Sequence, residues 1–139
     1  MPQDDFEREC DRLSQIVDGP QFERLRWDRN EGPMLAGLVA LAMAALETRS
    51  EFELAEEGST SAIKRFVLKI HSIRTVAISI QLKDGVVHVG AERIDRSAYR
   101  LAGGDPHMAE FGSVDELWMA NALKDLFSRV HVQPQPETL

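Results

Sequence analysis

Cysteine is almost absent from this chain, and its scarcity excludes several ways of building a small protein. The lone Cys10 cannot form a disulfide within the chain and cannot by itself build a zinc site. Cys10 also shares a helical stripe with Phe6, Leu13 and Val17. We therefore expect a buried, inert thiol there rather than a nucleophile. Stability has to come from packing.

Long apolar runs are missing as well. The longest lies between Glu31 and Glu47, which is shorter than the roughly 20 residues that a membrane-spanning helix needs. The first nine residues are acidic and lack the basic opening and apolar centre of a secretion signal. The sequence therefore predicts a soluble protein that resides in the cytoplasm.

Positive charge is in deficit, since the formal net charge is -7. Nucleic acids and anionic membranes attract clustered Lys and Arg, so this balance argues against both as partners. One segment, with Arg24, Arg26, Trp27 and Arg29, combines cations with an aromatic ring that could stack on a base, but acidic residues interrupt it. The charge favours a protein or a small ligand as the partner.

The signatures of several large enzyme classes are also missing. The chain has no glycine-rich phosphate loop ending in Gly-Lys-Ser/Thr, no G-x-G-x-x-G, no G-x-S-x-G and no H-E-x-x-H. No motif implies a cofactor, and we expect none.

The first third of the chain has helical periodicity. Residues 4–17 form one expected helix, which Asp18, Gly19 and Pro20 end. Residues 21–30 are expected to form a short helical turn. Gly32 and Pro33 then introduce residues 34–46, which are rich in Ala, Leu and Met and have no polar face. We expect this helix to be covered on all sides, at the centre of the domain or in a subunit interface.

From Ser50 onward the apolar period changes to two, which predicts strands around residues 52–54 and 66–70. The clearest signal is a hairpin over residues 76–93 that turns at Asp84 and Gly85, because Asp-Gly tolerates the positive φ angles of a two-residue turn. The expected pairs are Leu82 with Val87, Ile80 with Val89 and Ile78 with Ala91.

The last third contains a loop and a helix. Residues 102–107 are expected to form a surface loop. Ser113 and Glu116 fit a capping box that starts a helix ending near Val130. The fold class that follows is α+β, with helices packed on one face of a mostly antiparallel sheet of about three to five strands. We expect a single domain over residues 1–132 and a disordered tail over residues 133–139.

The loop before this helix holds the best catalytic candidates. Asp105, His107 and Glu110 place two carboxylates and an imidazole close together, a set that could bind a divalent ion or assist proton transfer. The alternative is ordinary turn chemistry with solvated side chains. The spacing matches no metal template, so no metal site is assigned.

A second candidate is the sheet face opposite the apolar one. Its small residues could form a shallow floor for an anionic ligand or an extended peptide. The candidate ligand-binding residues on and beside this floor are Arg65, Lys69, His71, Ser79 and His88. The alternative is a solvated face, or one whose small residues accommodate a helix.

Self-association is the third possibility. Trp27, Leu117 and Trp118 lie outside the expected core stripes and are candidate interface residues, as is the all-round apolar helix. A single core could equally hide them. The leading interpretation is a non-catalytic protein-binding module, adaptor-, inhibitor- or chaperone-like, that forms a homodimer. The alternative is a small-ligand or metal-dependent enzyme that uses the Asp105, His107 and Glu110 loop.

Overall fold

The computed structural model describes residues 2–133 and forms two compact units, Met1–Met34 and Leu35–Leu139. The boundary between the units falls inside one continuous helix, α2 (Gly19–Ala45). The single domain expected over residues 1–132 stays a prediction, and residues 134–139 of the expected tail lie outside the described part. No helix among the described residues is both long and apolar enough to cross a membrane.

The first unit contains α1 (Pro2–Val17) and the first half of α2. Asp18 joins the two helices, and its carboxylate accepts a hydrogen bond from the backbone N–H of Gln21 at 3.1 Å. The predicted break at Gly32 and Pro33 is wrong, because α2 continues through Pro33. Strong helix formers, beginning with Met34, Leu35 and Ala36, follow the proline and outweigh the one hydrogen bond that it cannot donate.

The second unit is built on an antiparallel sheet, which confirms the α+β class. Five strands pair in the order β1-β2-β3-β4-β6 and two more form a separate ribbon, β5-β7. Their bounds are β1 (Phe52–Glu56), β2 (Ile63–Ile70), β3 (Ile73–Lys83), β4 (Val86–Glu92), β5 (Tyr99–Leu101), β6 (His107–Glu110) and β7 (Val130–Val132).

Strands β3 and β4 turn at Asp84 and Gly85, whose φ angles are +52° and +75°. Both angles lie in the left-handed region that a tight two-residue hairpin turn needs. The strands pair Leu82 with Val87, Ile80 with Val89 and Ile78 with Ala91. This is the register expected from the sequence.

A second tight turn, between β2 and β3, has no glycine. His71 and Ser72, which directly follow the strand expected over residues 66–70, adopt φ angles of +52° and +67°. The backbone N–H of His71 donates to the carbonyl of Glu51 at 2.9 Å, which ties the turn to the segment before β1. Residues other than glycine rarely adopt positive φ, so the surrounding structure has to hold this turn in place.

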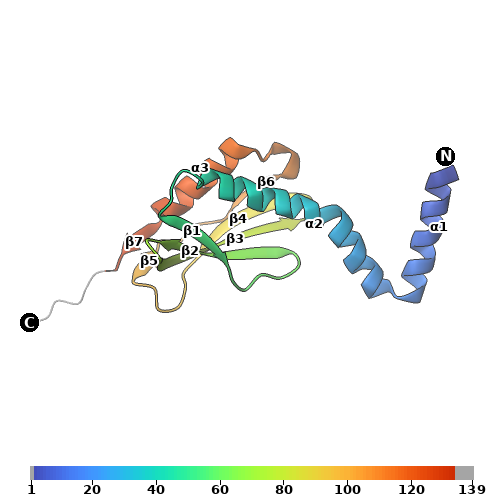
Figure 1. The fold of residues 1–139 in the computed structure, drawn as a ribbon, viewed down its shortest axis with the longest axis horizontal. Helices are drawn as coiled ribbons and strands as arrows, with labels where there is room; N and C mark the ends of the chain where they lie inside the picture. Colours follow the sequence, from blue (N-terminus) through green and yellow to red (C-terminus); the bar gives the residue numbers. More distant parts are fainter. Residues whose placement is uncertain (1, 134–139) are drawn as a thin grey trace, which may run out of the picture. The chain divides into compact units, whose positions relative to one another are not determined.

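Two helices lie over one face of the sheet: the last part of α2 and α3 (Glu116–Ser128) (Figure 1). They bury Leu35, Leu38, Met119 and Leu126. The apolar part of α2 does not thread the centre of the domain, since Ala36 and other residues away from this stripe are exposed, and a place in a subunit interface stays a prediction. Ala and Gly carry little apolar surface, so exposing them costs little.

The start and end of α3 differ from the prediction. The cap is Asp115, whose carboxylate accepts from the N–H of Trp118 at 2.8 Å, whereas Ser113 belongs to a preceding 3-10 turn, η1 (Phe111–Ser113). An ionised cap also interacts favourably with the helix dipole, which accounts for the choice of Asp over Ser. The helix ends at Ser128, and the chain continues into β7 rather than extending the helix to Val130.

Candidate functional site

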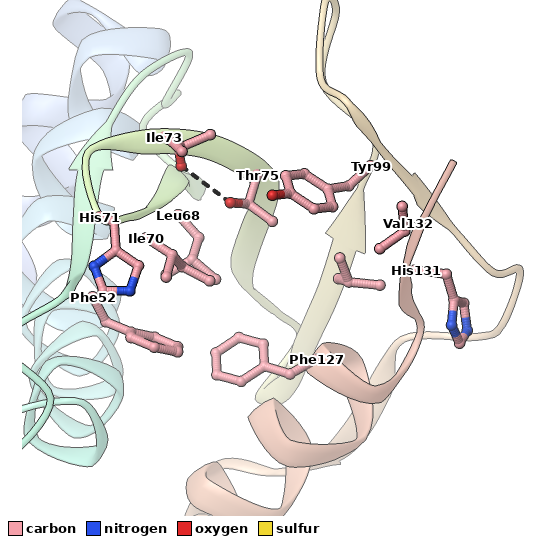
Figure 2. Close-up of a pocket in the computed structure, with 11 residues that line it drawn as sticks. Phe52, Leu68, Ile70, His71, Ile73, Thr75, Tyr99, Phe127, His131 and Val132 are labelled. Atoms are coloured by element: carbon pink, nitrogen blue, oxygen red, sulfur yellow. Dashed lines mark hydrogen bonds between the residues drawn. The ribbon is translucent and has the colours of Figure 1, made fainter. Parts of the chain in front are cut away.

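A largely apolar pocket of about 330 Å³ lies where the five-stranded sheet meets the β5-β7 ribbon. Figure 2 shows side chains from β1, β2, β3, β5, β7 and α3 around it. Its apolar lining comes chiefly from Phe52, Leu68, Ile70, Ile73, Phe127 and Val132. Elements distant in the sequence therefore build one site.

Two aromatic rings form one wall of this pocket. The centroids of Phe52 in β1 and Phe127 in α3 are 6.0 Å apart, and the ring planes are inclined by 52°. Tilted pairs at this separation are favourable for aromatic side chains. Both rings are only half-buried, so part of each remains open to an incoming apolar group.

Polar groups in the pocket are few and separated. The Thr75 hydroxyl donates to the Ile73 carbonyl at 3.0 Å, so it is already satisfied. His71 and His131 lie at opposite ends of the pocket and are exposed (Figure 2). Among the described residues no group of three or more His, Cys, Asp or Glu side chains could hold a metal ion. The pocket is thus suited to receiving apolar side chains.

Two further cavities adjoin the pocket at Phe52. One, of about 310 Å³, follows β1 and includes Met43, Leu46 and Leu54. The other, of about 320 Å³, lies between the end of α2 and α3, where Leu46 and Leu123 face it. Phe52 lines all three cavities. We call the three together the Phe52 groove.

The groove follows a free sheet edge. Strand β1 pairs with β2 on one side and, within residues 2–133, with no strand on the other. The unpaired N–H and C=O groups of an edge strand can accept another extended chain. The rim of the groove carries both signs of charge, from Glu47, Arg49, Glu53 and Lys124.

No family model, curated protein or solved structure matches this chain.

Asp105, His107 and Glu110 do not converge. His107 and Glu110 are both in β6 and three residues apart, so their side chains point to opposite faces of the sheet. Asp105 lies in the exposed loop before the strand, and no hydrogen bond or ion pair joins its side chain to another described residue. The three residues share a segment but no common centre.

His107 pairs instead with α3. Its Nε2 atom lies 2.8 Å from Oδ2 of Asp125, and Arg129 donates to the same oxygen at 2.7 Å. The hydrogen bond with His107, followed by the one from Arg129, holds the pKa of Asp125 below its ordinary value. The guanidinium of Arg129 also lies close against Gly104, so the three side chains hold the preceding loop onto α3.

The second sheet face is partly closed. Ile94, just after β4, lies over Val67 and Ala77, and these three residues form a small buried cluster. Pro106 covers Gly90, since a Cβ atom added there would lie 3.4 Å from the proline Cβ. The open floor expected around Ser79 and His88 is therefore smaller than the strand pattern indicates, and both residues are half-buried.

The basic residues beside this face lie against acids. Nε of Arg65 is 3.4 Å from a carboxylate oxygen of Glu92, and Nη1 of Arg65 donates to the Glu57 carbonyl at 3.2 Å. The hydrogen bond from Arg74 lowers the pKa of Glu57. Lys69 stands opposite Glu53 in the β1-β2 register. His71 belongs to the β2-β3 turn at the groove, so these residues do not form one cationic site.

The interface candidates lie in different surroundings. Trp27 is half-buried, with its indole ring against Gly32 of the same helix. Leu117 is 70% exposed at the start of α3, next to the end of α2, whereas Trp118 is half-buried. The prediction of a buried Cys10 is wrong, because the thiol and the rest of its helical stripe are exposed.

The sequence pattern predicts a strand at Phe52 and includes Phe127 in the helix expected to end near Val130, which indicates an ordinary core. Neither pattern shows that the two rings meet at a cavity. The one available signal was β1 itself, a short alternating strand that follows the apolar helix directly and contains Phe52 and Leu54.

Proposed function

We propose that this chain is a non-catalytic protein-binding module that takes an extended, apolar segment of another protein into the Phe52 groove. The segment adds to the free edge of β1 as a further strand. The observation that carries the proposal is that Phe52 lines three adjoining cavities at an edge strand.

Strand addition uses two sources of affinity. Backbone hydrogen bonds to the edge fix the segment, and alternate side chains enter pockets beside the strand. The cavity along β1 receives such side chains near Met43 and Leu46. Each Leu or Val side chain that becomes fully buried contributes roughly 1.5–3 kcal/mol. A few apolar side chains at alternate positions therefore suffice for specific binding.

Two exposed methionines provide a matched pair for the test. Met43 is 41% exposed at the groove, and Met108 is 58% exposed on β6, the opposite edge strand. Neither is buried, so Glu at either position leaves the core intact. The probe is a fluorescent synthetic peptide in which leucine alternates with threonine between terminal lysines, and fluorescence anisotropy measures its binding.

We expect Met43→Glu to weaken peptide binding at least about tenfold, which corresponds to roughly 1.4 kcal/mol. Met108→Glu should bind as the native chain does. A second peptide with N-methylated alternate amides keeps the side chains but cannot form the strand, and it should not bind. Equal losses in both variants, or equal binding of both peptides, would overturn the proposal.

An adaptor, an inhibitor and a chaperone all need such a surface, and the proposal covers these three roles alike. Residence in the cytoplasm remains a prediction from the sequence.

A further inference from the structure

Helix α1 exposes a continuous apolar stripe. Phe6 is 66% exposed, Leu13 51%, Ile16 68% and Val17 82%. No residue between positions 4 and 34 is buried, so the first unit has no core of its own. A 16-residue helix is marginal in water unless its apolar face packs against something.

The neighbouring helix of the first unit does not cover this stripe. Glu7 and Asp11 of α1, together with Arg26 and Arg29 of α2, line a cleft of about 170 Å³ between the helices. Successive helical residues are about 100° apart, so this polar side of α1 lies away from the stripe. The first unit therefore does not cover the stripe itself.

The spacing of the stripe is that of a two-stranded helical seam. Phe6, Cys10, Leu13 and Val17 follow one another at intervals of four, three and four residues. Alternating intervals of three and four place these residues at the a and d positions of a heptad, where side chains from two helices interlock. The apolar stripe of α1 is therefore suited to packing against another helix with the same spacing.

We propose that a second copy of this chain covers the stripe, with the two α1 helices packed antiparallel. The distribution of charge along α1 favours this arrangement. Residues 2–9 carry four acids and one base, whereas residues 10–17 carry one of each. A parallel pair would bring two acidic halves together, and an antiparallel pair sets each acidic half against a neutral one. Cys10 then lies opposite Leu13 of the second copy.

A pair of point variants tests the interface. Leu13→Asp places a charge in the seam, and Gln15→Asp places the same charge on the opposite, exposed side of α1. Light scattering after size-exclusion chromatography should show a dimer for the native chain and for Gln15→Asp, and a monomer for Leu13→Asp. A native chain that stays monomeric at high micromolar concentration would overturn the proposal, as would a Leu13→Asp variant that remains dimeric.

Cysteine crosslinking tests the orientation. With copper phenanthroline as the oxidant, the native chain should give few covalent dimers, because Cys10 faces leucine. Leu13→Cys should give many, because Cys10 then faces a cysteine across the seam. Strong crosslinking of the native chain would contradict the antiparallel arrangement. The dimer and the Phe52 groove are tested independently. Peptide binding can still be measured in Leu13→Asp, and Met43→Glu should still form the dimer.

Discussion

The Nε2 atom of His107 lies 2.8 Å from Oδ2 of Asp125, and this contact joins the first residue of β6 to α3. Arg129 completes the cluster, and its own backbone carbonyl accepts from the N–H of Ala102 at 2.8 Å. The loop between β5 and β6 is therefore held at both ends. A segment that looks like a potential reactive centre in the sequence has a structural role here.

The cluster makes stability depend on pH. The pKa of Asp125 is held low by its hydrogen bonds with His107 and Arg129. A carboxyl group whose pKa is lower in the folded state stabilises that state above its unfolded pKa of about 4, and the contribution is lost as the pH falls through the folded pKa. The native chain should exceed Asp125→Asn in free energy of unfolding at neutral pH, and the difference should shrink in acid.

Urea unfolding at a series of pH values measures this difference. Asp105→Asn is the matched control, because no hydrogen bond or ion pair joins the Asp105 side chain to another described residue. If Asp125→Asn unfolds at the same urea concentration as the native chain at neutral pH, the cluster does not stabilise the loop.

Two neighbouring glycines test the close packing of the same loop. A Cβ atom at Gly104 would lie 2.6 Å from Cζ of Arg129, whereas at Gly103 it would meet nothing within 4 Å. Gly104→Ala should displace Arg129 from Asp125 and so destabilise the chain by the loss of this exposed ion pair. Gly103→Ala should be neutral or gain roughly 0.4–1 kcal/mol by restricting the unfolded chain. Thermal unfolding of the two variants would show Gly104→Ala to be the less stable, and the reverse order would be inconsistent with the packing described.

Local patterns predicted the parts of the fold that local forces determine. The β3-β4 pairs follow from alternating apolar residues and from a dipeptide that tolerates positive φ. The α+β class follows from the change of period after residue 50. The turn at His71 and Ser72 was missed because neither residue is glycine, and only pairing across β2 and β3 shows that the chain reverses there.

The candidate site could not be predicted for a related reason. Strand β7 is three residues long and pairs with β5, from which about thirty residues separate it. The pocket is completed by this pairing and by the meeting of Phe52 with Phe127. Such contacts depend on the packed chain rather than on periodicity. The prediction of a buried Cys10 was wrong for a different reason: its helical stripe is present, but no residue of the first unit covers it.

Hydrogen exchange of the β1 backbone tests the central proposal most directly. When the alternating leucine peptide is added, the outward-facing amides of β1 (Phe52–Glu56) that follow Phe52 should exchange more slowly, because they donate to the added strand. The N–H of Phe52 itself already donates to the Arg49 carbonyl at 3.0 Å. The amides of β6 (His107–Glu110), on the other edge, should exchange at an unchanged rate. Peptide binding that leaves β1 exchange unchanged, or that protects β6 instead, would contradict strand addition at the Phe52 groove.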